Sequence, residues 1–404
     1  MKENAKAVAI DYPILGSAFL LILAGLTCLY SISTGSERSL FQTGFGRQVV
    51  WFFLGTGLIV AVLAIPLQWI FRGVYFFYGL SLVLLVLVFF IGKEKIHRWI
   101  NVGIFHFQPS ELAKIATLLA LARFFSKEKI LGWKRLLGTL GLVMVPIILI
   151  IKEPDIGTAT VFFALWVGML IWAGMSIKIA LWVLVPFLAF VSGFHPVSFI
   201  GFMIVVVVLF VLTKQKWWVG LGVGALCVCL GRMAPIIWST LASYQQQRIL
   251  IFLGMKSDPH GAAYQIIQSK VAIGSGGILG KGFLNGSQTQ LRFLPEQHTD
   301  FVLSVLGEEF GFIGIALVMS TFLFLFSRIF RVAKTARYPF ASFIAAGSVS
   351  ILAFQFLVNS GMTVGLFPVT GLPIPFLSYG GSSLFMAMVL VGLTVNVSSH
   401  RYEY

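Results

Sequence analysis

The stretch "PILGSAFLLILAGLTCLYSI", Pro13–Ile32, contains no charged side chain. A helix of about 20 residues rises about 30 Å, which is the thickness of the hydrocarbon core of a bilayer. Comparable apolar stretches recur along the whole chain, and we place them at 13–32, 48–68, 74–92, 110–125, 137–151, 156–174, 178–194, 198–213, 217–238, 302–327, 340–360 and 383–398. The pattern predicts an all-α polytopic membrane protein, a helical bundle with about twelve transmembrane helices.

The composition agrees with this class. Of the 404 residues, 58% are hydrophobic and only 11% are charged, whereas soluble domains carry about 25% charged residues. The net charge of +15 comes from cations in loops between apolar spans, where membrane topology and anionic lipid headgroups account for most of them. No basic patch is interleaved with aromatic residues, so we expect membrane lipids, and no nucleic acid, as partners.

The cysteines and the N-terminus add little. Cys28, Cys227 and Cys229 lie inside apolar runs without metal-ligand spacing, so no disulfide framework is expected. The polar N-terminus precedes a full-length span, so we expect it to be retained and not cleaved as a signal peptide.

Loop charges predict the topology. The most basic short loops, 123–135 and 328–337, become cytoplasmic if both termini are cytoplasmic, as the positive-inside rule expects. The loop at 92–112 is also basic, yet this count places it outside, which suggests another role for its cations. A second outside segment, 239–301, is far longer than an ordinary connection and is expected to be functional. We expect a single membrane domain, 1–404.

Several polar motifs allow both a structural and a chemical interpretation. The glycine run "GSGGILGKG" fails the Walker A pattern, so a backbone-exposing loop is the better interpretation. In "FQPSELAK", Pro109 suits the first helical position, with Gln108 or Ser110 helping to satisfy the amides there. Glu111 and Lys114 share a helix face, either as a structural pair or as the lining of a hydrated cavity.

Two further motifs are interpreted as structural. In "KEPDIGTA", capping of the next helix by Glu153 or Asp155 is the simpler account. The uncharged segment 359–383, rich in Gly, Pro and Ser, is interpreted as a cavity wall, because irregular backbone at membrane depth requires protein or a cavity beside it.

The octapeptide "LPEQHTDF", Leu294–Phe301, holds Glu296, His298 and Asp300 at the start of an apolar span. Ionisable residues beside lipid usually mark a pathway or a reactive site. Close carboxylates and partial desolvation raise a carboxyl pKa toward that of a general base. The alternative is that Asp300 caps the following helix.

At this point the sequence resembles the SEDS family (shape, elongation, division and sporulation), nearer its elongation members than its division members. The motifs are "RWINVGIFHFQPSELAK", "EPDIGTA", "YQIIQSKVAIGSGGILGKGFL", "QLRFLPEQHTDF", "GEEFGFIG" and "GLPIPFLSYGGSS". The resemblance implies a peptidoglycan glycosyltransferase that polymerises lipid II into glycan strands on the outer face of the bacterial inner membrane. It also implies that Asp300 is the catalytic general base and that undecaprenyl pyrophosphate is the leaving group.

A pyrophosphate leaving group requires nearby cations. With the polar residues of the motifs, the candidate substrate-binding residues are Arg47, Arg98, Gln108, Ser110, Glu111, Lys114, Arg248, Lys270, Lys281, Glu296, His298 and Thr299. A divalent cation such as Mg²⁺ would share the same charge, although the sequence shows no dedicated carboxylate cage.

The resemblance also implies partners: a class B penicillin-binding protein, MreC, MreD and RodZ. The family has about ten spans, so we interpret 175–216 as an inserted helical hairpin. Two alternatives remain open, a lipid II flippase and a structural scaffold of the elongation machinery. A transporter would place its charges near the bilayer midplane, whereas these charges cluster at the outer rim.

Overall fold

The computed structural model describes residues 10–34, 43–91, 98–102, 105–127, 133–175, 177–213, 217–240, 243–252, 263–291 and 293–400. The chain divides into two compact units, Met1–Met169 with Asp258–Tyr404, and Leu170–Ser257. They are described separately below.

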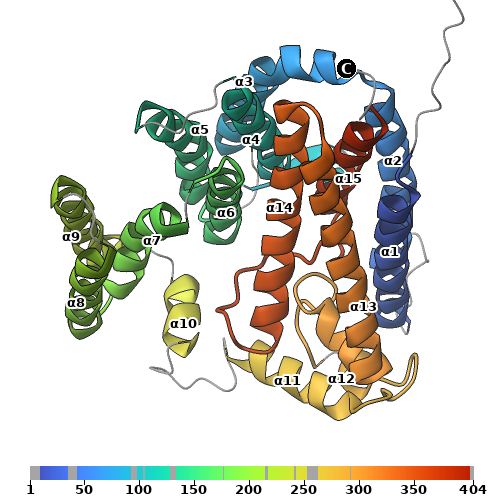
Figure 1. Cartoon of the computed structure of the whole chain (residues 1–404). Helices are drawn as coiled ribbons and strands as arrows, with labels where there is room; N and C mark the ends of the chain where they lie inside the picture. Colours follow the sequence, from blue (N-terminus) through green and yellow to red (C-terminus); the bar gives the residue numbers. More distant parts are fainter. Residues whose placement is uncertain are drawn as a thin grey trace, which may run out of the picture. The chain divides into compact units, whose positions relative to one another are not determined.

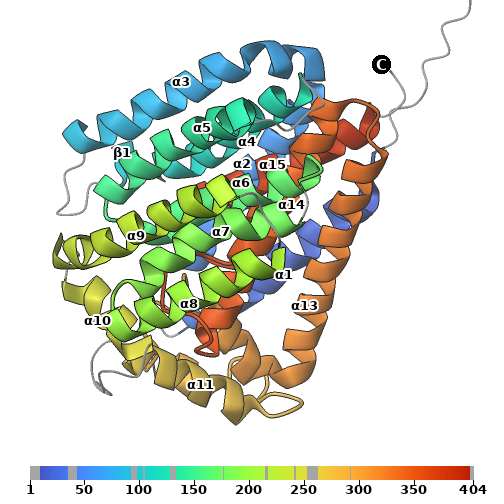
Figure 2. The same cartoon turned by 60° about the vertical axis from the view of Figure 1, so that its left-hand side comes forward.

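The larger unit is almost entirely helical (Figures 1 and 2). Its helices are α1 (Tyr12–Ser33), α2 (Gly44–Ala64), α3 (Leu67–Ile91), α4 (Pro109–Ser126), α5 (Trp133–Lys152), α6 (Ile156–Trp172, up to Met169), α11 (Tyr264–Gly276), α12 (Ser287–Gln290), α13 (Val302–Thr335), α14 (Pro339–Thr363) and α15 (Gly381–Ser399). Within the predicted loop 92–112, β1 (Ile100–Val102) pairs antiparallel with β2 (Phe105–Phe107). This short hairpin is the exception to the all-α prediction.

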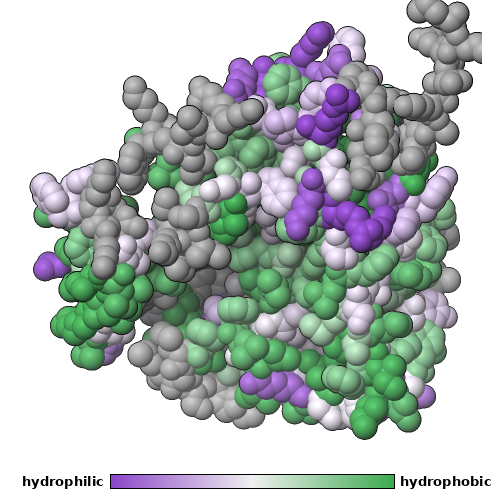
Figure 3. Space-filling view, viewed as in Figure 1, coloured by the Kyte–Doolittle hydropathy of each residue, from purple (hydrophilic) through white to green (hydrophobic). Residues whose placement is uncertain are grey.

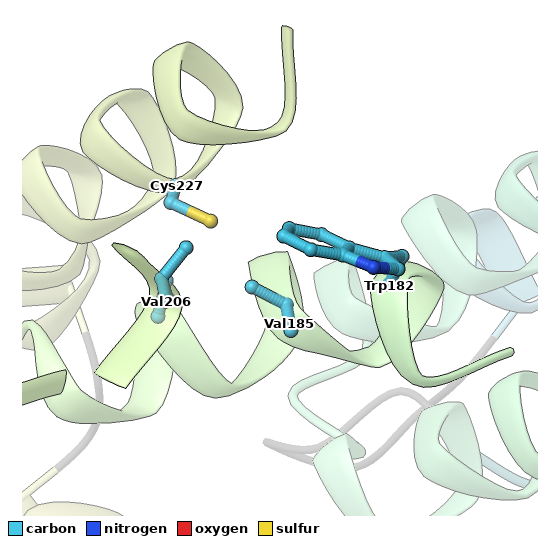
Figure 4. Packing of buried hydrophobic residues seen from close by; sticks show 5 residues of the cluster. Trp182, Val185, Val206 and Cys227 are labelled. Atoms are coloured by element: carbon cyan, nitrogen blue, oxygen red, sulfur yellow. The ribbon is translucent and has the colours of Figure 1, made fainter. Parts of the chain in front are cut away.

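The smaller unit contains α7 (Ile177–Ser192), α8 (Pro196–Thr213), α9 (Trp217–Thr240) and α10 (Ser243–Phe252). Helix α7 packs against both α8 and α9. Trp182 and Val185 of α7 meet Val206 of α8 and Cys227 of α9 in a buried cluster (Figure 4). The turn between α7 and α8 has the form of a helical hairpin, and its interpretation as an insertion stays a prediction, as do the other predicted domain divisions.

Length and hydropathy identify this as a membrane protein. In the described residues, seven helices are long and apolar enough to cross a bilayer, namely α1, α2, most of α3, α8, α13, α14 and α15. Shorter apolar helices lie at Leu136–Lys152, Ile156–Trp172 and Gly220–Ile236. A helix overlaps each of the twelve predicted stretches. The predicted class is therefore confirmed, whereas the count of twelve crossings stays a prediction.

The surface fits a lipid environment. Large apolar side chains are exposed on α2 and α3, including Phe53, Phe76 and Phe90, the last at 82%. Hydrophobic colours cover much of the helical surface in Figure 3. Exposed apolar area on this scale is unusual for a soluble monomer and ordinary for lipid-facing helices.

Several helices of the larger unit pack around α13 and α14. Helix α13 contacts α14, α11 and α1, while α14 also contacts α4 and α15. Figures 1 and 2 show α13 and α14 joined at one end, with α11 and α12 at the other. Residues at the start of α13 therefore lie at the α11 end.

Helix α13 is interrupted near its start. Gly311 has φ +65° and ψ −160°, a conformation that glycine adopts at little cost. At this interruption the carbonyls of Glu308 and Glu309 accept hydrogen bonds from the amides of Lys281 and Gly282, each at 3.0 Å. In return, the amides of Phe312 and Ile313 donate to carbonyls of the 277–278 turn. The glycine run thus exposes its backbone, as expected, and uses it to pair with the interrupted helix.

Candidate functional site

The octapeptide Leu294–Phe301 forms a polar turn anchored at both ends. Leu294 and Phe301 are buried in a cluster with Met362 and Val369. Between them, the carbonyl of Glu296 accepts the amides of Thr299 at 3.2 Å and Asp300 at 3.0 Å. The apolar ends thereby hold the polar residues of the motif in one compact turn.

Asp300 lies just before α13 and does not occupy its N-cap position. The N-cap residue is Phe301, which makes no side-chain cap. The interpretation of Asp300 as the N-cap is therefore wrong. Asp300 is partly buried at the helix start, and its chemical role stays a prediction.

The uncharged segment between α14 and α15 lies against this turn. Asn359 of α14 donates through Nδ2 to the carbonyls of Asp300 at 2.9 Å and Leu372 at 2.6 Å. The amide of Tyr379 donates to the carbonyl of His298 at 2.8 Å. A Cβ placed on Gly371, whose φ is +72°, would lie 3.7 Å from Oδ2 of Asp300. The segment thus lies beside the Asp300 carboxylate, with Gly371 next to it.

Helices α1 and α2 also contact this uncharged segment. The buried side chain of Gln48 donates to the carbonyl of Ser378 and accepts from the amide of Gly380, both at 3.2 Å. A Cβ on Gly25 would come within 2.6 Å of the carbonyl oxygen of Leu377. These contacts join the first two helices to a segment more than 300 residues later in the chain.

The starts of α4, α6 and α15 meet near this segment. A Cβ on Gly157 of α6 would lie 2.6 Å from the carbonyl oxygen of Thr370. The amide of Gln108 donates to Oγ of Ser382 at 3.2 Å, and its side chain reaches Oδ2 of Asp155 at 3.5 Å. The structure therefore brings Gln108 and Asp155, from two of the predicted motifs, close to the segment that lies beside Asp300.

Asp155 caps α6, as expected. Its Oδ1 accepts the amide of Thr158 at 3.1 Å, and its Oδ2 accepts the hydroxyl of Thr158 at 2.9 Å. Pro109 begins α4, also as expected. Gln108 helps to satisfy the first amides through its backbone, because its carbonyl accepts the amide of Glu111 at 3.1 Å. Neither side chain takes part, since Gln108 makes no side-chain cap and buried Ser110 Oγ has no hydrogen-bond partner.

Glu153, by contrast, is a buried carboxyl without a hydrogen bond. Its side chain is 1% exposed, and neither carboxylate oxygen has a hydrogen-bond partner. Arg98 donates to the backbone carbonyls of Glu153, at 2.9 Å, and of Pro154. Burial, with the nearby charge of Asp155, raises the pKa of Glu153 to about 8 despite the opposing charge of Arg98.

This pKa predicts a pH-dependent stability. Unfolding restores the ordinary pKa of 4.5, so between that value and about 8 the unfolded chain loses a proton that the folded protein keeps. The stability contributed by Glu153 therefore falls as pH rises through this window. We expect the unfolding temperature of wild type to fall more between about pH 5 and about pH 8 than that of Glu153→Gln. Parallel curves for the two proteins would contradict the assignment.

Glu111 and Lys114 form a buried ion pair on α4. Nζ of Lys114 lies 2.8 Å and 2.9 Å from the two oxygens of Glu111, and the residues are 0% and 4% exposed. The predicted pairing on one helix face is therefore present.

Glu308 organises the segment between α11 and the Asp300 turn. Its fully buried carboxylate accepts from Nζ of Lys281 at 2.8 Å and from three consecutive residues of α12: Ser287 Oγ, the amide of Gln288, and both the amide and Oγ1 of Thr289. The positive charge of Lys281 is therefore paired with Glu308, and the sequence alone did not predict this pairing.

The remaining candidates lie apart from Asp300 or at the surface. Arg47 is exposed on α2, and Lys270 is exposed on α11, where a Cβ on Gly365 would meet its Nζ at 2.7 Å. Glu296 is exposed and His298 is partly exposed, with 3.9 Å between Oε2 and Nε2. Arg248 belongs to the smaller unit.

The chain matches the sequence pattern of one protein family over nearly its whole length. The family is described as "Cell cycle protein" and named for FtsW, RodA and SpoVE, and the match covers residues 13–200 and 196–403. The chain belongs to this family. The resemblance drawn from the SEDS motifs is thereby confirmed.

Curated relatives carry three names. Peptidoglycan glycosyltransferase MrdB of Escherichia coli K12 is 35% identical, covering 96% of this chain and 94% of the relative. Peptidoglycan glycosyltransferase RodA of Treponema pallidum is 32% identical, covering 97% and 98%. The probable peptidoglycan glycosyltransferase FtsW of Geobacter sulfurreducens is 33% identical, covering 96% and 95%.

A solved structure has the same fold. It is a chain of a peptidoglycan synthase complex, described as showing the structural coordination of polymerization and crosslinking. The TM-score is 0.73 at 28% identity, covering 98% of this chain and 99% of that chain. The helical family fold is therefore shared with that chain.

Sequence reasoning missed the uncharged residues that position the site. Asn359 lies within an apolar helix and Gln48 begins the apolar run of another, and an amide buried in a membrane helix usually has a partner. That signal was available for both residues. For Glu308, by contrast, nothing local indicated that α12 would supply its donors.

Proposed function

We propose that this SEDS-family protein is a RodA-like peptidoglycan glycosyltransferase that polymerises lipid II into glycan strands during cell elongation. The observation that carries the proposal is the position of Asp300. Its carboxylate lies at the start of α13, beside Gly371 of the uncharged segment. The names of the full-length relatives, MrdB and RodA, support the same reaction class.

In the proposed reaction, Asp300 accepts the proton of the 4-hydroxyl on the acceptor GlcNAc. The hydroxyl oxygen forms a bond to the anomeric carbon of the donor MurNAc. The bond from that carbon to the pyrophosphate breaks, and undecaprenyl pyrophosphate leaves with the electron pair. The nascent glycan is thereby extended, and Asp300 returns its proton to solvent. General-base assistance of this kind contributes about 10²–10⁴ in rate.

The leaving pyrophosphate requires positive charge. Lys114 and Lys281 are ion-paired with Glu111 and Glu308, and Arg98 donates to backbone carbonyls. We therefore rank the exposed Lys270 and Arg47 first as pyrophosphate ligands, while Arg248 stays a candidate.

A divalent cation would share this charge. Among the described residues, no group of three or more His, Cys, Asp or Glu side chains is placed to hold a metal ion. A role for Mg²⁺ stays a prediction, and the proposed steps use protein groups alone.

Charge at the opposite end of α13 supports an outer-face site. Arg331 and Lys334 follow in the last turns of α13, and Arg337 lies in the short connection to α14. The positive-inside rule assigns such an end to the cytoplasm. Asp300, at the other end of the helix, would then face the outside of the bacterial inner membrane, with both termini inside.

The partner we propose is a class B penicillin-binding protein that crosslinks the strands. The similar chain from a peptidoglycan synthase complex supports it. MreC, MreD and RodZ follow from the family resemblance alone. The division role of an FtsW-like polymerase is the closest alternative function, since relatives of that name also match.

The test is the product made by the purified wild-type protein. Together with its class B partner, whose transpeptidase is disabled, it is given lipid II in detergent and in vesicles. We expect glycan polymer and released undecaprenyl pyrophosphate. Intact lipid II that crosses the vesicle bilayer, without polymer, would support the flippase instead.

A further inference from the structure

Gln297 stands inside the octapeptide but differs from its polar neighbours. Glu296 is exposed and His298 is partly exposed, whereas Gln297 is 5% exposed. Its Nε2 donates to the carbonyl of Thr289 at 3.4 Å. The amide therefore joins the Asp300 turn to α12.

Thr289 continues this connection to Glu308. Its amide at 3.0 Å and its hydroxyl at 2.9 Å both donate to Oε2 of Glu308. Thr289 is itself 2% exposed, and Glu308 is 0% exposed. The carboxylate is thus bound to one side of Thr289, while Gln297 is bound to the other.

Glu308 is held in place by hydrogen bonds to both its backbone and its side chain. It lies in the short part of α13 that precedes Gly311, where its own carbonyl accepts the amide of Lys281. A carboxylate accepts several donors at once, whereas an amide of the same shape offers only one oxygen. Charge-assisted bonds of this kind are also the stronger ones.

We infer that Glu308, Thr289 and Gln297 form a relay that positions the Asp300 turn for the reaction. None of the three touches substrate in this account. They are positioning residues, and the inference rests on the proposed glycosyltransferase activity. A carboxylate that must reach one hydroxyl proton loses rate when its backbone shifts by about 1 Å.

The test is steady-state polymerisation of lipid II by Gln297→Leu. Leucine fills a similar volume at this buried position, and the substitution removes only the amide group. We expect kcat to fall about tenfold while KM for lipid II changes less than about twofold, because ground-state binding is untouched. The unfolding temperature of each variant is measured in parallel.

The relay also predicts non-additive effects. Glu308→Gln and Gln297→Leu act through the same Thr289, so the double variant is expected to lose no more than the worse single variant. Where Glu308→Gln does not fold, Thr289→Val takes its place, since it removes only the hydroxyl. Ser275→Ala is the control: its hydroxyl donates to the carbonyl of Ala272 within α11 at 2.9 Å and has no bond to the three relay residues, so kcat should stay unchanged.

The outcomes separate the relay from the function itself. A wild-type protein that makes no polymer overturns the proposed function. A wild-type protein that polymerises lipid II, with Gln297→Leu at the wild-type kcat, overturns the relay alone. Fully additive losses in the double variant also overturn it.

Discussion

Replacement of Lys114 by methionine is expected to destabilise the protein by about 3–5 kcal/mol. Lys114 is fully buried, and its Nζ contacts both oxygens of Glu111. Methionine fills much of the same volume but leaves a carboxylate buried without its counter-charge. Removing one partner of a buried pair is far more costly than removing both. The measurement is the unfolding temperature of the purified protein in detergent.

Two further variants make this prediction specific. Glu111→Leu combined with Lys114→Met removes both charges and is expected to recover most of the lost stability. Lys281→Met is the matched control, because Lys281 is 28% exposed and Glu308 keeps its bonds from Ser287, Gln288 and Thr289. The loss of stability in Lys281→Met should be clearly smaller than that in Lys114→Met. Equal losses for the two lysine variants would contradict the assignment of Lys114 as the buried structural partner.

The parts of the fold that the sequence predicts correctly depend on local signals. Apolar length locates the helices, Pro109 locates the start of α4, and Asp155 locates the start of α6. The Glu111–Lys114 pair follows from a spacing of three on one helix. Apolar length acts within a single helix and the other signals within about one helical turn, so no knowledge of the tertiary fold is required.

The parts that sequence does not predict depend on distant contacts. Gln48 meets Ser378 across 330 positions, and Ser31 donates to Glu309 across 278. Such pairs form only when the helices of the bundle have packed together. The charge of Lys281 illustrates the consequence, since it is a cation in the sequence and half of an ion pair in the structure.

The candidate site divides in the same way. The octapeptide predicts Asp300 through its ionisable residues at a membrane helix start. Asn359 and Gly371, which lie against Asp300, carry no charge and belong to a segment that meets the octapeptide only in the folded protein. Charged groups stand out against an apolar sequence, whereas uncharged positioning groups do not.

Replacement of Asp300 by asparagine is expected to lower the rate of lipid II polymerisation by about 10²–10⁴. Asparagine keeps the size and shape of the side chain but cannot accept the hydroxyl proton. The turn itself should persist, because it is held by the backbone carbonyl of Asp300 at Asn359 and by buried Phe301. Binding of lipid II should therefore change little.

Asp11→Asn is the matched control for this substitution. Asp11 lies before α1, where both of its oxygens accept from Arg328, toward the end of α13 opposite Asp300. The same chemical change there should leave polymerisation near the wild-type rate. A general effect of losing any aspartate would lower both rates alike.

The most direct measurement is the yield of glycan polymer from wild type, Asp300→Asn and Asp11→Asn, purified side by side. Each is given lipid II and the class B partner with its transpeptidase disabled. The account predicts polymer from wild type and from Asp11→Asn, and almost none from Asp300→Asn. Polymer from Asp300→Asn at the wild-type rate would contradict it and would move the general base to Glu111 or Glu296.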